Sequence, residues 1–267
     1  MTTKVESWTD ITESIESVPD SVALDEMRRY AATLTPASAP EPTEDVPSEL
    51  DLSTYLHYIR SQGGQGCWGY SLLSICDIMN EMVCPYSPNL SMNMGLFLHR
   101  RRDLWEKQGG INSPDGRYHK QVGNKWMDQS FGCPTEGTEL THPSTRWTGN
   151  WTQEGVNEAD NYKLASDVKT IPVRSGNFTH WLSSGHPIQL EDDAHVIAVV
   201  GYSVSRRTFK FVNSYGDRWG QGGFGQYTFE EIDEGRGKWG KLGNAYVVDI
   251  IPPRSVPTAR IHFHHVD

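Results

Sequence analysis

The sequence predicts an α+β protein with a buried helix early in the chain and antiparallel strands near its end. Residues 67–83, CWGYSLLSICDIMNEMV, are apolar on most sides, which is typical of a buried helix. Residues 195–202, HVIAVVGY, form an apolar run typical of a buried strand, and residues 208–216 alternate as a second strand. Residues 245–251, AYVVDII, predict another strand. Since the strands follow the helix instead of alternating with it, the helical and β-rich layers are expected to be segregated.

Residues 1–47 are expected to form an acidic, proline-rich arm. Eleven acidic and three basic residues give the first 50 residues a charge of -8, which leaves -2 for the other 217 of the 267 residues. A short helix is predicted over 21–34, where apolar residues recur on one face and Asp20 or Ser21 can cap the start. Residues 35–47 contain four prolines, a composition typical of an extended linker.

The main domain is expected to span residues 48–254 and to be followed by a short tail, 255–267. Its middle part mixes two predicted helices, 94–108 and 117–129, with loops rich in glycine, proline and tryptophan. A turn over 203–207, SVSRR, separates the first two strands.

Composition excludes several classes of protein. A net charge of -10 argues against a general nucleic-acid binder, which would carry a basic face. The polar start MTTKVESWTD lacks the apolar run of a signal peptide, and no stretch is apolar enough to span a bilayer. Four cysteines are too few for a disulfide scaffold at this length. These features predict a cytoplasmic protein without a membrane partner.

Three separated residues predict nucleophilic catalysis. Cys67 follows a glycine-rich turn and opens the predicted buried helix, where backbone N–H groups and the helix dipole favour a thiolate. A nucleophile of this kind needs a base, and the base needs a third group to orient it. His195 opens the first strand, and Asn213 lies 18 residues later near the end of the second, so antiparallel pairing can bring the two side chains together.

The motifs around these residues resemble those of the papain-like cysteine peptidases, in the broad sense of a divergent, bacterial-type member. Q-G-x-x-G-C-W-x-Y-S from Gln62 resembles the nucleophile signature, and H-x-x-x-x-x-G-Y from His195 resembles the histidine strand. N-S-Y-G-x-x-W-G-x-x-G-F from Asn213 resembles the asparagine motif. Their order, and the spacings of 128 and 18 residues, are those of the family. The resemblance covers roughly 48–252.

The resemblance implies a papain-like fold of two subdomains, one helical around the cysteine helix and one β-rich, with the site between them. It implies that Cys67 is the nucleophile, His195 the general acid and base, and Asn213 the residue that orients the imidazole. Gln62 and the Cys67 backbone N–H would form the oxyanion hole. Substrate contacts are expected from residues beside these positions. They are Gly63, Gly64, Trp68, Ala194 and Trp219.

The chain also departs from the family pattern. Four residues separate Gln62 from Cys67, where five are usual, and Tyr215 stands where tryptophan is usual. Gly64 replaces the cysteine three positions before the nucleophile, so the usual disulfides are expected to be absent. Pro187 fits the G-x-P strand start that precedes the histidine in many bacterial members.

The predicted activity is hydrolysis of peptide bonds in a peptide or protein substrate through a thioester acyl-enzyme, without cofactor or metal. One alternative is an acyltransferase, such as a ligase or cyclase, in which an amine resolves the same thioester. Another is a non-catalytic binding module on the same scaffold. The arm is either inhibitory, through contact of residues 21–34 with the catalytic domain, or a docking or disordered segment.

Other chemistry-bearing residues are expected to be structural. Asp192 and Asp193 either tune the pKa of His195, repel an anionic substrate or belong to a solvated loop, and the loop is the simpler interpretation. Cys76, Cys84 and Cys133 lack zinc-ligand spacing. A frayed tail is expected for the C-terminal histidines, which are His262, His264 and His265. WGQGGFG does not match a phosphate-binding loop.

Overall fold

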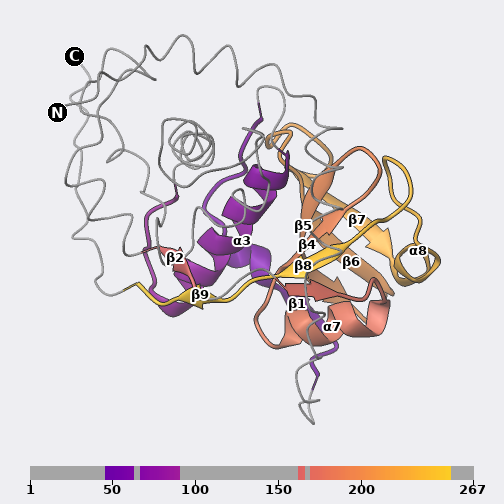
Figure 1. Cartoon of the computed structure of the whole chain (residues 1–267), viewed down its shortest axis with the longest axis horizontal. Coiled ribbons are helices and arrows are strands. Elements are labelled where there is room, and N and C mark those ends of the chain that lie inside the picture. The colour runs from indigo at the N-terminus through magenta and orange to yellow at the C-terminus, as the bar shows by residue number, and fades with distance from the viewer. Residues whose placement is uncertain (1–45, 63–66, 91–161, 166–168, 254–267) are drawn as a thin grey trace, which may run out of the picture.

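A computed structural model describes residues 46–62, 67–90, 162–165 and 169–253 (Figure 1). In chain order the elements are β1 (Glu49–Asp51), the 3-10 helix η1 (Leu52–Tyr55), α3 (Cys67–Val83), β2 (Lys163–Leu164), β3 (Lys169–Ile171), α7 (Ser175–Ser183), β4 (Ile188–Glu191), β5 (Val196–Ser203), β6 (Thr208–Val212), β7 (Phe224–Thr228), α8 (Phe229–Glu234), β8 (Ala245–Val247) and β9 (Ile250–Ile251). The predicted helices at 21–34, 94–108 and 117–129 lie outside the described residues, as do most of the arm and all of the tail.

A seven-stranded sheet organises the described part of the chain. Its strand order is β3-β8-β4-β5-β6-β7, and β1 pairs with the last residues of β5. All the pairings are antiparallel, as the sequence predicts. Every residue of β5 is buried, because strands flank it on both edges and helices pack against it. Helix α7 packs on β4, β5 and α8, while β2 and β9 form a separate two-stranded sheet.

Helix α3 is the buried helix that the sequence predicts. It begins at Cys67, ends at Val83 and packs against β4 and β5, and Figure 1 shows it lying beside the sheet. Leu72, Leu73 and Ile78 have no exposed side-chain surface. Burying such side chains contributes roughly 1.5–3 kcal/mol each, so packing against the sheet stabilises this helix more than its intrinsic propensity does. The α+β fold class is confirmed.

Three of the predicted strands differ in extent. The strand predicted over 195–202 runs from Val196 to Ser203, so His195 precedes it. The strand predicted over 208–216 ends at Val212. The backbone N–H of Asn213 still donates to the carbonyl of Gly223 in line with the β6–β7 register, and the chain then turns through Gly216 at φ +83°. The strand predicted over 245–251 is two strands, of which β8 belongs to the main sheet and β9 pairs with β2. The turn predicted over 203–207 spans 204–207, because Ser203 is the last residue of β5.

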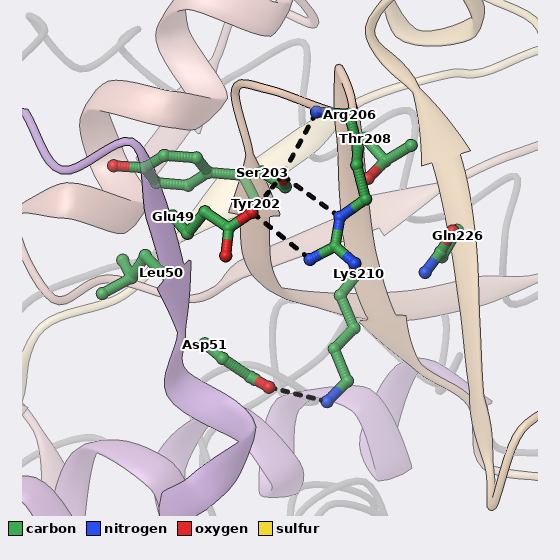
Figure 2. A pocket seen from close by; sticks show the side chains of 9 residues that line it. All are labelled: Glu49, Leu50, Asp51, Tyr202, Ser203, Arg206, Thr208, Lys210 and Gln226. Atoms are coloured by element: carbon green, nitrogen blue, oxygen red, sulfur yellow. Dashed lines mark hydrogen bonds and ion pairs between the residues drawn. The ribbon is translucent and has the colours of Figure 1, made fainter.

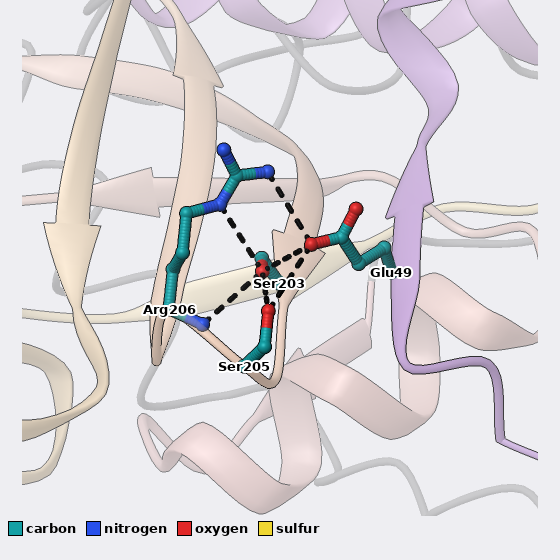
Figure 3. A network of polar contacts seen from close by, with 4 residues as sticks. All are labelled: Glu49, Ser203, Ser205 and Arg206. Atoms are coloured by element: carbon teal, nitrogen blue, oxygen red, sulfur yellow. Dashed lines mark hydrogen bonds and ion pairs between the residues drawn. The ribbon is translucent and has the colours of Figure 1, made fainter.

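Polar contacts fasten the start of the described chain to the end of β5. Figure 3 shows Glu49 Oε1 accepting hydrogen bonds from the hydroxyls of Ser203 and Ser205, with Arg206 beside them. These two hydroxyls, and then the Arg206 charge, lower the pKa of Glu49. The backbone is fixed as well, since Val204 N–H donates to the Ser48 carbonyl.

A polar pocket of about 270 Å³ lies over this part of the sheet (Figure 2). Asp51 and Lys210 form an ion pair of 2.8 Å across it, reaching from β1 to β6. Partial burial raises the pKa of Asp51, but the hydrogen bonds from Lys210 and Ser53 outweigh it, so that the pKa lies below its ordinary value. Gly201 of β5 pairs with Asp51 on one side and with Lys210 on the other, so it lies between these two residues in the sheet.

Gly201 is required by the close approach of β1. A Cβ at this position would lie 2.5 Å from the Leu50 carbonyl oxygen and 3.1 Å from the Asp51 Cα. Both are backbone atoms, which cannot move aside without disturbing the β1 pairing.

We expect Gly201→Ala to lower the free energy of unfolding by about 1–3 kcal/mol, because the new methyl group displaces β1. Gly176→Ala is the matched control, since nothing lies within 4 Å of a Cβ there and the residue is inside α7. That variant should be stabilised by about 0.5–1 kcal/mol. Urea unfolding of both variants measures the difference, and equal effects would contradict the close approach.

Candidate active site

His195 and Asn213 are joined by a hydrogen bond at the same end of two neighbouring strands. Ala198 of β5 pairs with Val212 of β6, which brings the residue before β5 close to the residue after β6. The distance from His195 Nε2 to Asn213 Oδ1 is 2.7 Å, and both residues are almost fully buried. Because an amide oxygen only accepts, Nε2 carries the proton and the neutral ring is left with Nδ1 as its basic nitrogen.

Aromatic rings cover this hydrogen bond. The Tyr215 ring stacks on His195 with centroids 4.6 Å apart, and the Trp239 ring meets the imidazole edge-on at the same separation. The Tyr215 hydroxyl lies 3.4 Å from His195 Nδ1. Trp219 lies behind both rings, 6.2 Å from Tyr215 and 6.0 Å from Trp239. Excluding water strengthens the hydrogen bond between His195 and Asn213.

The residues before His195 form a tight, anchored turn. Asp192 is buried, and its Oδ1 accepts the backbone N–H groups of Ala194 and His195. Its Oδ2 accepts the N–H of Trp239 at 3.0 Å, which ties the aromatic cover to the same turn. The solvated-loop interpretation is therefore wrong for Asp192, whose carboxylate satisfies three backbone donors. Asp193 is exposed, and its carboxylate accepts a hydrogen bond from the Lys241 backbone N–H.

Cys67 is the first residue of α3 and is fully buried. The next residue is Trp68, whose carbonyl oxygen accepts a hydrogen bond of 2.7 Å from Gln189 Nε2 of β4. Since β4 and β5 form the hairpin that carries His195, this bond joins the first turn of the cysteine helix to the histidine strand. The start of a helix favours an anionic sulfur, because its backbone N–H groups have no partners within the helix.

Gln62 lies beside Asn213 in space. Its backbone N–H donates to the Ser214 carbonyl at 2.6 Å, and its side-chain Oε1 accepts the Ser214 hydroxyl. The preceding residue, Ser61, forms an isolated antiparallel β-bridge with Tyr215. Because the Gln62 amide oxygen accepts the Ser214 hydroxyl, the amide nitrogen Nε2 lies on the side away from Ser214. An amide nitrogen in this position can donate a hydrogen bond to an oxyanion.

A buried ion pair holds the segment before Gln62 against α3. Arg60 Nη2 lies 2.5 Å from Asp77 Oδ2, and both side chains are almost fully buried. The Arg60 carbonyl accepts the Gly216 N–H, so the same residue also contacts the loop that follows Asn213. Burial, and then the charge of Asp77, raise the pKa of the neighbouring Cys76 thiol far above its ordinary value. Three cysteines are thiols and form no disulfide bond; they are Cys67, Cys76 and Cys84.

The predicted substrate contacts fall in different environments. Trp68 is buried in the core, whereas Ala194 is exposed beside His195 and Trp219 is half-buried. Gly63 and Gly64 lie outside the described residues. The catalytic and substrate roles of all these residues stay predictions.

The remaining features that could indicate a function are a metal site, a membrane-spanning helix, the other cysteine and histidine residues, and the pocket. Within the described ranges, no group of three or more His, Cys, Asp and Glu side chains is arranged to hold a metal ion. No helix in the described part of the chain has the length and hydrophobicity needed to cross a bilayer. Cys133 and the C-terminal histidines lie beyond the described ranges. The polar pocket of Figure 2 is at the Ser203 end of β5, opposite to His195.

Sequence reasoning missed Trp239, Gln189 and Arg60. Trp239 stands in a glycine-rich stretch without a recognisable motif, and the partners of Gln189 and Arg60 are distant in sequence. For Gln189, the only sequence feature that could have pointed to a role is a polar residue in an otherwise apolar strand.

Comparison with known proteins supports the fold. No protein-family model matches the sequence, and no curated protein matches it either. Among solved structures, xylellain, a cysteine protease from Xylella fastidiosa, superposes with a TM-score of 0.58 at 17% identity, over 82% of this chain and 95% of that one. A structure from work on the mite allergens Blo t 1 and Der p 1 gives a TM-score of 0.60 at 15% identity, over 91% and 82%. The proform of the ragweed pollen cysteine protease Amb a 11 gives 0.58 at 14%, over 86% and 74%. The chain has the papain-like fold.

We expect Asp192→Ala to lower the free energy of unfolding by about 2–4 kcal/mol. The change leaves three backbone N–H groups without their hydrogen-bond acceptor, and two of these groups are in the turn at His195. Asp193→Ala is the matched control at the neighbouring exposed position and should cost less than about 1 kcal/mol. Chemical denaturation of both variants tests this. Similar losses for the two would show that the Asp192 contacts do not hold the turn.

Proposed function

We propose that the chain is a cysteine peptidase that hydrolyses peptide bonds in peptide or protein substrates. The observation that carries the proposal is the buried hydrogen bond between His195 and Asn213, with Cys67 at the start of a helix that is bonded to the same hairpin. The papain-like fold supports it, since the solved neighbours named above include cysteine proteases.

In the proposed reaction, the Cys67 thiolate attacks the substrate carbonyl carbon and forms a tetrahedral intermediate. The Gln62 amide and the Cys67 N–H stabilise the negative oxygen. The His195 imidazolium gives its Nδ1 proton to the leaving amine, the C–N bond breaks, and a thioester remains. The neutral imidazole then takes a proton from water, whose oxygen attacks the thioester and releases the acid and the thiolate.

Asn213 keeps the ring in place through both half-reactions. Its oxygen accepts a hydrogen bond from Nε2–H and leaves that proton on the ring. Nδ1 therefore stays the nitrogen that exchanges protons with the substrate. A neutral amide does this without cancelling the imidazolium charge that stabilises the thiolate. The aromatic cover limits competition by water for this bond.

We expect Cys67→Ala to abolish cleavage of a peptide library, with kcat/KM reduced by at least ~10³-fold, because no other group replaces the nucleophile. Cys84→Ala is the matched control, a half-buried cysteine just beyond the same helix, and should keep full activity. Adding an amine acceptor separates hydrolysis from acyl transfer: acids as the dominant products support the peptidase, and amides would favour the transferase.

Alkylation by iodoacetamide, read by peptide mass mapping, gives an independent check. At neutral pH Cys67 should be modified much faster than Cys76, because the raised pKa of Cys76 keeps it a thiol. If Cys67 does not react and neither the unaltered chain nor Cys67→Ala cleaves any peptide, the chain is a binding module and the proposal fails. Cleavage by Cys67→Ala at the rate of the unaltered chain would also overturn the proposal, because the nucleophile would then be another group.

A further inference from the structure

Gln189 occupies an unusual place for a polar side chain. It lies in the middle of β4, in register with Ala198 of β5 and Tyr246 of β8, and is 1% exposed. Its Nε2 donates to the Trp68 carbonyl at 2.7 Å and to the Ser71 hydroxyl at 2.8 Å. Both partners belong to the first turns of α3. The side chain thus contacts the helix directly behind Cys67.

These bonds are not needed to satisfy the helix. The Ser71 hydroxyl already donates to the Trp68 carbonyl at 3.0 Å. The other end of the Gln189 amide, Oε1, is buried and has no hydrogen-bond partner among the described residues. A buried acceptor without a partner is destabilising, whereas an apolar side chain of similar size avoids that cost. Stability of the core therefore does not account for a glutamine at this position.

Gln189 does connect the two halves of the candidate site. Leu190 pairs with Ile197 and Glu191 with Val196, so β4 and β5 form a rigid hairpin whose turn leads directly into His195. The turn itself is fixed by Asp192. A bond from β4 to the residue after Cys67 therefore sets the position of the helix start relative to the imidazole. Directional hydrogen bonds fix such a position more narrowly than apolar contact, which tolerates sliding.

We propose that Gln189 is a positioning residue that holds the start of α3 so that the Cys67 sulfur is aligned with His195. This inference rests on the proposed function, because alignment matters only where thiol and imidazole react together. Misplacing a reacting group by about 1 Å can cost ~10²-fold in rate, so a modest shift of the helix start has a measurable effect.

The test compares Gln189→Leu with the unaltered full-length chain. The expected result is an unchanged or higher urea midpoint, a kcat about tenfold lower, and a KM changed less than twofold, since alignment and not substrate binding is lost. The rate of Cys67 alkylation at neutral pH should fall in parallel, and its pH profile should shift toward that of an ordinary thiol. A stabilised but slower protein is an outcome that a purely structural role does not produce.

Leu190→Met is the matched control, since it is a volume-conserving change on the opposite face of the same strand and should leave kcat within twofold. If Gln189→Leu does not fold, Gln189→Met replaces it as a more flexible side chain of similar length. Unchanged kcat and alkylation in the folded variant would overturn the inference, as would an activity loss that only follows unfolding. The proposed function fails separately, if Cys67→Ala remains active.

Discussion

The pairing of β5 with β6 is the constraint on which the candidate site depends. Cys67, His195 and Asn213 are spread over 147 residues, and no local structure can bring them together. Antiparallel pairing places the residue before β5 beside the residue after β6. Because β5 is buried on both faces, a shift in register would exchange the side chains of the two faces and disrupt their packing. The distance of 2.7 Å between His195 and Asn213 is therefore a property of the sheet as much as of the two side chains.

The cysteine helix is fixed to this sheet from both sides of Cys67. On the N-terminal side, Gln62 binds Ser214, the residue after Asn213. On the C-terminal side, Trp68 binds Gln189 on the histidine hairpin. The first contact lies in the segment after β6 and the second in β4, so the residues on the two sides of Cys67 are held by different parts of the sheet. Rigid placement of this kind reduces the reorganisation that a reacting site would otherwise need.

The sequence was sufficient for what is encoded locally. The periodicity of α3 and the apolar run of β5 predicted those elements closely, because burial on most sides leaves a strong pattern in the residues themselves. The end of β6 at Val212 was not predictable from alternation, because the pattern does not mark where the chain leaves the sheet for the turn at Gly216. Trp239 and Gln189 were missed for a related reason. Their positions depend on partners that only the folded sheet brings near, 121 residues away in the case of Gln189.

Gly201 and Tyr202 complete the motif that begins at His195, yet they lie at the other end of β5. Gly201 admits the backbone of β1, and the Tyr202 hydroxyl donates to the Pro47 carbonyl. One half of the motif thus carries the proposed chemistry, and the other half attaches the incoming chain. The two roles are physically separate, so replacing His195 would leave the contacts of Gly201 and Tyr202 with the incoming chain in place. A sequence signature of this kind identifies the scaffold more reliably than it identifies an enzyme.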